Sequence, residues 1–435
     1  MKCSIITSFP DLYSPFLQTS LVGRARDTEL VTVSLVNLLD YVASKERIDA
    51  PTFGPGPGML IKPTVVEAAI GHAEKEGTAF RIFFSPQGTK LNSTVLRTIQ
   101  QKVADRNNHL MLVTARYEGM DARVEEEYAD MVISIGDYVL MGGDLPAMVL
   151  LESLFRFVPG VIGNEQSITQ DSFAGPFVDY PEFTQPVVWH NKEVPAIIRS
   201  GNHGTIKQWR REAQAAKTVK QHFQWLRTYP LNGEDKALAA RYIPAHYTVL
   251  MHSDVLLPHE GVGTTSVTSI DIHDGARSAH TYGIKNYCIV TPLLDQQTIV
   301  RTLLDFWHEG AGKEYNPHRH EALKDVLLMS AFDEVVAHIE QVEGKKPLVI
   351  ATSAKEVSGV PMASYYDQER VWVHARPVLL VFGTGKGLSQ SFLERCDYVL
   401  PPLVGFTEFN HLSVRAAMAI VFDRWLGINP VTRVG

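Results

Sequence analysis

Residues 131–146 read MVISIGDYVLMGGDLP, a short apolar run followed by a polar loop that contains three glycines. The apolar run, Met131–Ile135, predicts a β-strand because it is rich in β-branched residues and ends at a glycine. In open α/β sheets, ligands bind at the carboxyl ends of the strands, where loops of this kind lie. The loop that starts at Gly136 is therefore a candidate ligand-binding element, although a single such loop is more often an ordinary turn.

Two more loops of this kind follow predicted strands nearer the N-terminus. Ser85–Gly88 follows the strand-like run Phe80–Phe84, and Arg116–Gly119 follows Leu110–Val113. Three such loops together favour a shared ligand site over three unrelated turns. None of them contains the dinucleotide fingerprint G-x-G-x-x-G, and the chain has no phosphate-binding G-x-x-x-x-G-K-[ST] motif.

The segments around these loops alternate between strand-like and helix-like patterns. Ser4–Thr7 and Val31–Leu35 add two predicted strands, and apolar residues at helical spacing predict helices over Thr64–Lys75 and Ser93–Arg106. This alternation is typical of an α/β domain with a parallel sheet. We assign this N-terminal domain to residues 1–163.

The rest of the chain divides at changes of pattern. Residues 164–186, rich in Ser, Thr, Gly, Pro and Asp, predict a linker, and residues 187–244 predict a small basic domain with a helix over 203–228. Residues 245–435 repeat the α/β pattern, which predicts two sheet domains of related architecture around a helical insert. The predicted strands are Tyr247–His252, Tyr287–Val290, Pro347–Ala351, Val378–Phe382 and Tyr398–Leu400, and the predicted helices lie near 295–308, 319–330 and 411–426.

Composition excludes several classes of protein. The 435 residues are 45% hydrophobic and 20% charged, which excludes a mainly disordered chain, and this length suggests about three domains at roughly 150 residues each. Cys3, Cys288 and Cys396 are too few and too far apart for a disulfide scaffold and favour a reducing compartment. No apolar stretch reaches the ~18–20 residues of a membrane span, and the N-terminus lacks the apolar core of a signal peptide. We therefore expect a cytoplasmic protein that does not enter a membrane.

The net charge of −7 hides an uneven distribution. Residues 1–191 carry 15 basic and 23 acidic side chains, residues 192–244 carry 10 and 4, and residues 245–435 carry 16 and 21, which gives −8, +6 and −5. A basic segment between two acidic ones is a candidate site for a polyanion. The alternative is a solvated helical face, and the aromatic residues in this segment are more often part of a core than stacked on bases.

The loop motifs resemble those of the bacterial tRNA (guanine-N1)-methyltransferase family. That family methylates the guanine at position 37 of tRNA with S-adenosylmethionine as the methyl donor. The resemblance implies a SPOUT fold with a trefoil knot at the cofactor site, which is rare among proteins, an obligate homodimer with each active site at the subunit interface, and a dependence on Mg²⁺. It runs in order over about residues 1–240, in the segments Ser85–Gly88, Arg116–Gly119, Ile135–Tyr138, Gly142–Ala147, Ser153–Gly160, Asp171–Phe173 and Ser200–His203.

The resemblance assigns the chemistry to two residues. N1 of guanine bears a proton at neutral pH, so a base must remove it as the methyl group arrives, and Asp171 matches the family's general base. Loss of this proton places negative charge on O6 of the guanine. Arg156 matches the family residue whose guanidinium stabilises this charge. Without the resemblance, Asp171 is typical of a turn or helix cap, and Arg156 is typical of an exposed helix end.

Other residues match binding positions of the family. Glu118 is expected to contact both cofactor and guanine, and no cluster of metal ligands is evident for Mg²⁺. The residues expected at tRNA are Asp49, Gly58, Ser200, Asn202, His203, Trp209 and Arg210. The residues expected at the cofactor are Phe83, Ser85, Pro86, Gln87, Gly88, Arg116, Tyr117, Glu118, Gly119, Ile135, Gly136, Tyr138, Leu140, Gly142, Gly143 and Pro146.

This sequence departs from the family pattern in three places. The loop Thr52–Gly56 reads TFGPG, one residue longer and stiffer than the family's glycine run, which affects contacts expected on the guanine side. The acidic residue after Gly142-Gly143 is Asp144, where the family usually has Glu. The basic module ends near residue 241, earlier than in many members.

The last domain has its own set of loops. Residues 382–388 read FGTGKGL, and Leu400-Pro401-Pro402 and Asn410–Arg415 follow, which is similar to the cofactor loops of other SPOUT RNA methyltransferases. The resemblance implies a second S-adenosylmethionine site, whereas His374, Arg376 and Arg415 are only candidate RNA contacts. The expected residues of this second cofactor site are Phe382, Gly383, Gly385, Leu400, Pro402, Leu412 and Ser413.

Three functions are open for the whole chain. In the first, the N-terminal half methylates guanine 37 and the C-terminal half methylates another RNA site of unknown identity. In the second, the C-terminal domain only dimerises or binds RNA. In the third, the chain is a non-enzymatic RNA-binding protein, which the presence of Asp171 together with Arg156 disfavours.

Overall fold

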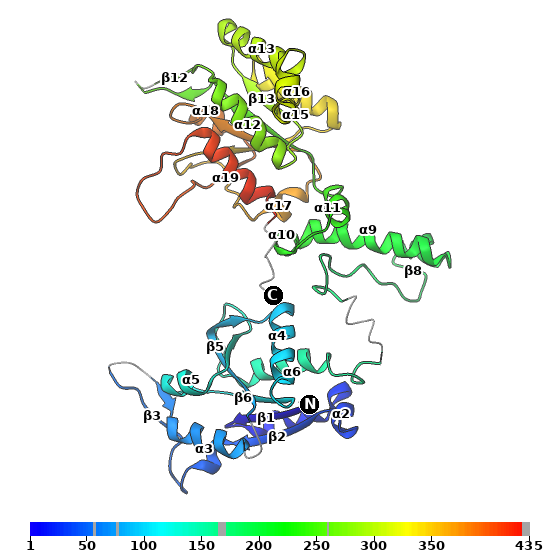
Figure 1. The fold of residues 1–435 in the computed structure, drawn as a ribbon, viewed down its shortest axis with the longest axis vertical. Helices are drawn as coiled ribbons and strands as arrows, with labels where there is room; N and C mark the ends of the chain where they lie inside the picture. Colours follow the sequence, from blue (N-terminus) through cyan, green and yellow to red (C-terminus); the bar gives the residue numbers. More distant parts are fainter. Residues whose placement is uncertain (55–57, 75–77, 164–170, 259–260, 429–435) are drawn as a thin grey trace. The chain divides into compact units, whose positions relative to one another are not determined.

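The computed structural model describes residues 1–54, 58–74, 78–163, 171–258 and 261–428. It divides into two compact units, Met1–Ala174 and Gly175–Gly435 (Figure 1). The division falls inside the predicted linker 164–186, and the predicted helical domain 187–244 shares a unit with the C-terminal domain. The finer domain boundaries expected from sequence remain predictions.

A parallel sheet forms the centre of the first unit. Its five strands among the described residues run in the order β2-β1-β6-β5-β7, and each neighbouring pair is parallel, as the sequence predicted. The interior strand β6 is buried along its whole length, which is typical of a strand covered on both faces. The strands are β1 (Lys2–Thr7), β2 (Thr32–Asn37), β5 (Phe80–Lys90), β6 (His109–Val113) and β7 (Met131–Ser134).

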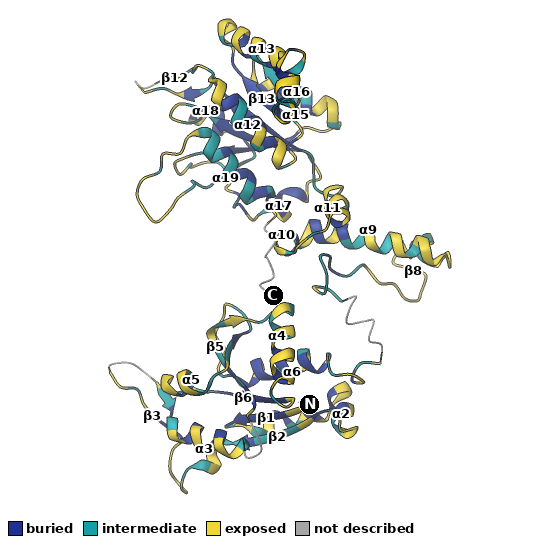
Figure 2. Ribbon diagram, in the orientation of Figure 1, coloured by how far each residue is buried: buried dark blue, intermediate teal, exposed yellow. Residues whose placement is uncertain are grey.

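Helices cover both faces of this sheet (Figure 2). Ile5 of β1 packs into a core with α2, α4 and α6, and the next residue, Ile6, packs into the opposite core with α3 and α5. This alternation follows from the two-residue period of a strand. The helices are α1 (Ser14–Gln18), α2 (Ser20–Asp27), α3 (Pro63–Ala73), α4 (Ser93–Ala104), α5 (Ala122–Tyr128) and α6 (Asp144–Phe155), with 3₁₀ turns at Pro10–Leu12 and Leu38–Tyr41 and a hairpin of β3 (Asp49–Pro51) and β4 (Met59–Ile61).

A second parallel sheet forms the centre of the C-terminal unit. Its six described strands run in the order β14-β13-β10-β16-β15-β17. The prediction of one helix over 319–330 was wrong, because the helix ends at Leu323 and the apolar run Val326–Met329 forms an edge strand. The strands are β10 (His246–Met251), β13 (Tyr287–Val290), β14 (Val326–Met329), β15 (Leu348–Thr352), β16 (Val378–Gly383) and β17 (Tyr398–Leu400), with a small hairpin of β11 (Val255–Leu256) and β12 (Val262–Gly263).

The two sheets share one topology. If β1 is matched with β10 and β2 with β13, then β6, β5 and β7 match β16, β15 and β17 in both spatial order and chain order. The second sheet differs by the additional edge strand β14. The prediction of two α/β domains of related architecture is therefore confirmed.

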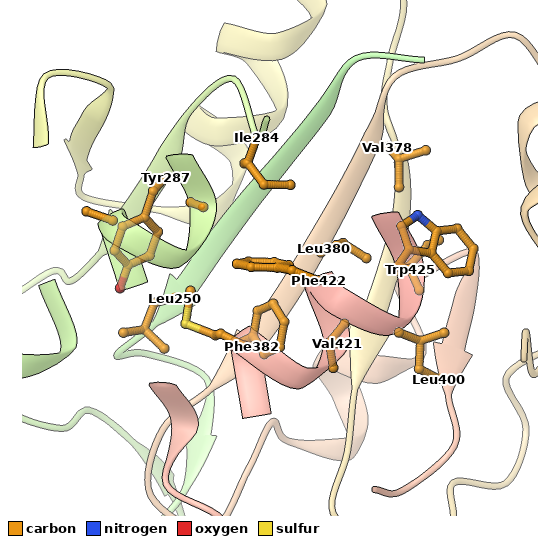
Figure 3. Close-up of a cluster of buried hydrophobic side chains, with 14 of the residues drawn as sticks. Leu250, Ile284, Tyr287, Val378, Leu380, Phe382, Leu400, Val421, Phe422 and Trp425 are labelled. Carbon is orange, nitrogen blue, oxygen red and sulfur yellow. The ribbon is translucent and has the colours of Figure 1, made fainter. Parts of the chain in front are cut away.

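The helices of the second unit also pack on both faces of their sheet. Figure 3 shows the larger core, in which Phe422 of α19 lies against Leu380 and Phe382 of β16, and Trp425 of the same helix lies beside Val378 and Leu400. The opposite face is covered by α16 and α18. The helices are α12 (Ser269–Thr281), α13 (Leu294–His308), α14 (Gly312–Tyr315), α15 (Pro317–Leu323), α16 (Phe332–Glu343), α17 (Gln368–Trp372), α18 (Gln390–Leu393) and α19 (Val414–Leu426).

The basic segment is helical but is interrupted. The predicted helix over 203–228 is divided at His222, where the backbone leaves helical geometry, so that α9 (His203–Gln221) ends before α10 (Phe223–Thr228). Phe223 and Leu226 pack into the same core as α17 and α19. The remaining elements of the segment are β8 (Val188–Trp189), β9 (Lys192–Glu193), α8 (Ala196–Arg199) and α11 (Gly233–Ala240).

Candidate active site

A cavity of about 370 Å³ lies beside the middle of β5 and at the carboxyl ends of β6 and β7. Its walls are the predicted loops after β6 and β7 and the segment Ser85–Gln87. The prediction that Ser85–Gly88 is a loop after a strand was wrong, because β5 continues to Lys90 and this segment forms an irregularity in its pairing with β7, between Phe84 and Thr89. Of the sixteen residues expected at the cofactor, fifteen line this cavity, and Gly88 does not. The volume lies in the range of about 300–1,000 Å³ that small-molecule sites occupy.

Glycines allow these loops to approach one another closely. A side chain at Gly88 would lie 2.7 Å from the backbone of Val132, so this glycine supports the wall although it does not line it. Gly142 forms an isolated antiparallel bridge with Arg116, and the amide of Gly143 donates to the carbonyl of Ala115 at 2.9 Å. The loop after β7 therefore closes back onto the end of β6.

A buried carboxylate lies beneath this junction. Asp144, the first residue of α6, is 2% exposed, and its Oδ1 accepts hydrogen bonds from the hydroxyls of Thr7 (2.7 Å), Tyr13 (3.0 Å) and Thr114 (2.9 Å). Its Oδ2 accepts from Nε of Arg116 at 3.0 Å. Burial and the nearby Asp144 raise the pKa of Tyr13 well above its usual value, which keeps this hydroxyl a donor. The carboxylate thus joins the ends of β1 and β6 to a side chain of the cavity.

The charges of the cavity wall suit S-adenosylmethionine. Among the described residues that line it, Arg116, Glu118 and Glu125 carry formal charge, for a net charge of −1. The cofactor carries a sulfonium, an ammonium and a carboxylate group, for a net charge of +1. Volume and charge therefore both fit this group. Glu125 was missed from sequence, and the available signal was the start of α5 directly after the loop Arg116–Gly119.

The β3–β4 hairpin lies beside the cavity. Gly58 has φ of +108°, and a side chain there would come within 2.2 Å of Cγ of Glu118, while the amide of Glu118 donates to the carbonyl of Met59 at 3.2 Å. Asp49 is buried and accepts two hydrogen bonds from Arg47, at 2.9 and 2.8 Å, which lower the pKa of its carboxyl group. Gly58 is thus placed next to the site, whereas Asp49 is held by Arg47. The altered loop at 53–58 lies partly outside the described residues.

Arg156 and Asp171 lie together but not at the cavity of the same chain. Arg156 follows the last residue of α6, and its guanidinium donates to Oδ2 of Asp171 in an ion pair. The two side chains are 46% and 39% exposed. Neither is among the residues that line the cavity. The sequence-predicted catalytic pair is therefore brought together in an exposed position.

The C-terminal unit has a cavity at the corresponding edge of its sheet. This cavity measures about 880 Å³ and is formed by the loops after β15, β16 and β17. Phe382, Gly383, Gly385, Leu412 and Ser413 line it, as expected for a second cofactor site. Two expected residues do not line it: Leu400, which is buried in the core beside Val421 (Figure 3), and Pro402. Thr384, Lys386 and His411 also line it; they lie in the quoted loop motifs but were not among the expected cofactor residues, and Asp271 lies outside those motifs.

The residues expected at tRNA in the basic segment include structural ones. The side chain of Asn202 caps α9 by accepting from the amides of Gly204 and Thr205, and the amide of Asn202 donates to the hydroxyl of Ser200 at 3.2 Å. Trp209 packs against Phe183, and the guanidinium of Arg210 stacks over Tyr180 at 4.4 Å. His203 is exposed at the start of α9.

The net charge of +6 overstates the cationic groups that the basic segment exposes. The guanidinium of Arg227 is buried, and it donates to the carbonyls of Gly427 (2.6 Å), Arg424 (2.7 Å) and Asp423 (2.8 Å) at the end of α19. Arg211 pairs with Asp235. The exposed lysines on α9 and at its end are Lys207, Lys217 and Lys220.

Other classes of site have weaker support. Within the described residues, no three His, Cys, Asp or Glu side chains gather closely enough to hold a metal ion. Across the same part of the chain, every helix is too short or too polar to cross a membrane. Cys3, Cys288 and Cys396 are unpaired, and burial raises the pKa of each thiol to about 12, so these cysteines are not reactive nucleophiles at neutral pH.

Comparison with known proteins relates the two parts of the chain to two families. A family model described as tRNA (guanine-1)-methyltransferase TrmD matches residues 1–228, and one described as SAM-dependent RNA methyltransferase matches residues 245–427. The tRNA (guanine-N(1)-)-methyltransferase of Nitratidesulfovibrio vulgaris is 38% identical over 98% of this chain and 99% of its own length, and that of Oleidesulfovibrio alaskensis is 36% identical over the same shares. The enzyme of that name from Gloeothece citriformis is 38% identical, but the match covers 50% of this chain and 93% of that protein. The chain therefore belongs to the TrmD family of tRNA (guanine-N1)-methyltransferases.

Proposed function

We propose that the cavity of the first unit binds S-adenosylmethionine and that this site methylates N1 of guanine 37 in tRNA. The activity of the family is tRNA (guanine-N1)-methylation, and the observation that carries the site assignment is the gathering of fifteen expected residues around one cavity of suitable charge. The cofactor supplies an electrophilic methyl group bonded to a sulfonium sulfur.

The residues of the chain supply the remaining chemistry. The Asp171 carboxylate accepts the proton of guanine N1, a role that contributes about 10²–10⁴-fold to the rate of such reactions. The Arg156 guanidinium donates to O6 as negative charge develops there. Their ion pair holds the cation close to the base before the guanine arrives.

The exposed position of this pair supports a site shared between two copies of the chain. In a homodimer, Arg156 and Asp171 of one protomer would complete the cavity of its partner. We also infer that the first unit has a SPOUT fold with a trefoil knot. The bridge between Gly142 and Arg116 returns the chain from β7 to the end of β6, and this return is compatible with a threaded loop.

We propose a second S-adenosylmethionine site in the cavity of the C-terminal unit. The matching sheet topology, the glycine-rich loop after β16 and the match to an RNA methyltransferase family support it. Its product would be a second methylated RNA nucleotide of unknown position. The alternative is a domain that dimerises or binds RNA without catalysis.

The remaining expectations concern partners and location. Exposed lysines on α9 support tRNA contact by the basic segment. Dependence on Mg²⁺ and a cytoplasmic location are implied by the resemblance alone. We include both in the proposal on that ground.

The test is the variant Asp171→Asn in the full chain, assayed with unmodified tRNA and labelled S-adenosylmethionine. We expect loss of 1-methylguanine at position 37 by about 10²–10⁴-fold, with affinities for cofactor and tRNA retained. The control is Asp179→Asn, a carboxylate later in the same loop region. Full activity of Asp171→Asn would contradict the mechanism. Any methylated nucleotide that Asp171→Asn still makes at another position would be assigned to the second cavity.

A further inference from the structure

Arg116 is the cationic residue of the first cavity, and its position is fixed on three sides. Its Nε donates to Asp144 at 3.0 Å, its guanidinium lies over the ring of Phe9 at 4.6 Å, and a side chain at Gly142 would come within 2.5 Å of its Cδ. The side chain is only 24% exposed. Its terminal nitrogens, Nη1 and Nη2, donate to no described residue. Arg116 therefore has two donors left for a ligand of the cavity.

Asp144 provides the most restrictive of these contacts. Three hydroxyl groups fix its Oδ1, which leaves Oδ2 to accept from the guanidinium. A buried carboxylate held in this way cannot rotate freely to follow a moving partner, since rotation would leave the buried hydroxyls of Thr7 and Tyr13 without an acceptor, whereas that of Thr114 can donate to the carbonyl of Ile6 at 3.0 Å. The position of Arg116 is thus set by Asp144.

We propose that Asp144 is a positioning residue for the methyl donor: it holds Arg116 where the two free nitrogens bind the carboxylate of the cofactor's methionine part. This inference rests on the proposed assignment of the cavity to S-adenosylmethionine. Glu118 and Glu125 on the same wall suit the ammonium and sulfonium groups, so the carboxylate pairs with the remaining charged residue, Arg116. A planar guanidinium with two parallel donors is well suited to a carboxylate.

The second unit shows that the fold does not require this carboxylate. The register of the strands places His252 at the position of Thr7, Thr384 at that of Thr114 and Lys386 at that of Arg116. The helix that corresponds to α6 begins with Val414 instead of an acidic residue, and Lys386 donates to the carbonyl of Pro258 at 3.0 Å. The same scaffold therefore forms with a neutral helix start, and Asp144 serves the ligand site of the first unit.

The test measures S-adenosylmethionine binding to the full chain by calorimetry and tRNA binding by filter retention. Asp144→Asn removes the negative charge and, where its amide group faces Arg116, places hydrogens against the guanidinium. We therefore expect the dissociation constant for S-adenosylmethionine at this cavity to rise by about 10- to 100-fold. The dissociation constant for tRNA should stay within about twofold. Any second binding event, from the other cavity, should not change.

Two further variants keep the test decisive. Arg116→Gln leaves Asp144 with its three hydroxyl donors, so it should fold and show the same loss, and the double variant should be no worse than either single one. Glu74→Gln is the matched control, since Glu74 is a half-buried carboxylate that receives two hydrogen bonds from Arg81 away from the cavity, and it should bind the cofactor normally.

Each other outcome overturns the inference. Unchanged cofactor affinity in either variant would refute the role of Asp144, and a selective loss of tRNA affinity would show that Arg116 binds an RNA phosphate instead. A wild-type chain whose binding of S-adenosylmethionine does not involve this cavity would overturn the proposed function as well. That last result is distinguishable, because Asp171→Asn would then still make 1-methylguanine at position 37 as the wild type does.

Discussion

Arg227 offers the sharpest test of how the two halves of this chain depend on each other. It lies at the end of the segment matched by the TrmD family, yet its guanidinium donates to three carbonyls of α19, in the segment matched by the second family. Burial lowers its pKa but leaves it charged, so it also stabilises the negative end of the α19 dipole. We therefore predict that Arg227→Met destabilises the second unit as a whole.

The size of the effect follows from the carbonyls left behind. The carbonyls of Arg424 and Gly427 lose the hydrogen-bond donor that the described structure gives them, whereas that of Asp423 keeps the amide of Gly427. An unsatisfied buried acceptor costs about 1–3 kcal/mol, so the loss at two carbonyls should lower the free energy of unfolding by about 2–6 kcal/mol. For a unit of this size that corresponds to a fall in melting temperature of about 4–24 °C.

The assay is differential scanning calorimetry of the full chain. The control is Arg199→Met, which removes a guanidinium of the same segment from an exposed pair with Glu193 and should cost less than about 1 kcal/mol. Arg227→Lys keeps the charge with fewer directed donors and should fall between the wild type and Arg227→Met. A shift below about 2 °C for Arg227→Met, or a shift equal to that of Arg199→Met, would refute this account of the junction.

Three further predictions concern the second unit. Replacing Lys207 and Lys217 by Glu should weaken tRNA binding and reduce the slope of log affinity against log salt by about 0.7–0.9 for each phosphate that the protein no longer neutralises, as measured by filter binding at several salt concentrations. A chain cut after residue 244 should expose the apolar side chains of Phe223 and Leu226, and α9–α11 should then exchange amide hydrogens faster than in the full chain. Burial lowers the pKa of His252 to about 4, below the value near 6.5 of the unfolded chain, so this neutral imidazole stabilises the fold above about pH 6.5 and that stability is lost as the pH falls toward 4. His252→Gln should reduce the difference in unfolding free energy between pH 7 and pH 5 by about 2 kcal/mol, as measured by urea unfolding.

The sequence predicted the strands of both sheets because each is a short apolar run bounded by turn residues. Tyr287–Val290 and Tyr398–Leu400 have the predicted bounds, and most other predicted strands differ by one or two residues at their ends. The exception is β5, which continues six residues beyond the predicted end at Phe84 and includes the predicted loop Ser85–Gly88. Val326–Met329 was predicted as part of a helix, since four apolar residues fit a buried strand and a buried helix turn equally well. Pairing with β13, far earlier in the chain, decides the outcome.

Most residues of the candidate site could also be predicted from the sequence. Loop residues such as Glu118 and Tyr138 line the cavity because the ends of parallel strands meet at one edge, which the sequence pattern implies. Leu400 was selected by its place next to a proline motif, but alternation along β17 turns it into the core. The charge of Arg227 could not be interpreted correctly, since its burial depends on the end of a helix about 200 residues away.

The two sheets of this chain place different polar groups at the same positions. Beneath the first cavity, Asp144 and the hydroxyls around it hold a guanidinium in place. Beneath the second, Nδ1 of His252 pairs with the hydroxyl of Thr265, which in turn contacts that of Thr384, so the corresponding network carries no charge. If both cavities bind one cofactor, they must bind its carboxylate differently, and an analogue that lacks this group should lose more affinity at the first cavity than at the second. Equal losses at the two cavities would show that the charged network contributes to folding alone.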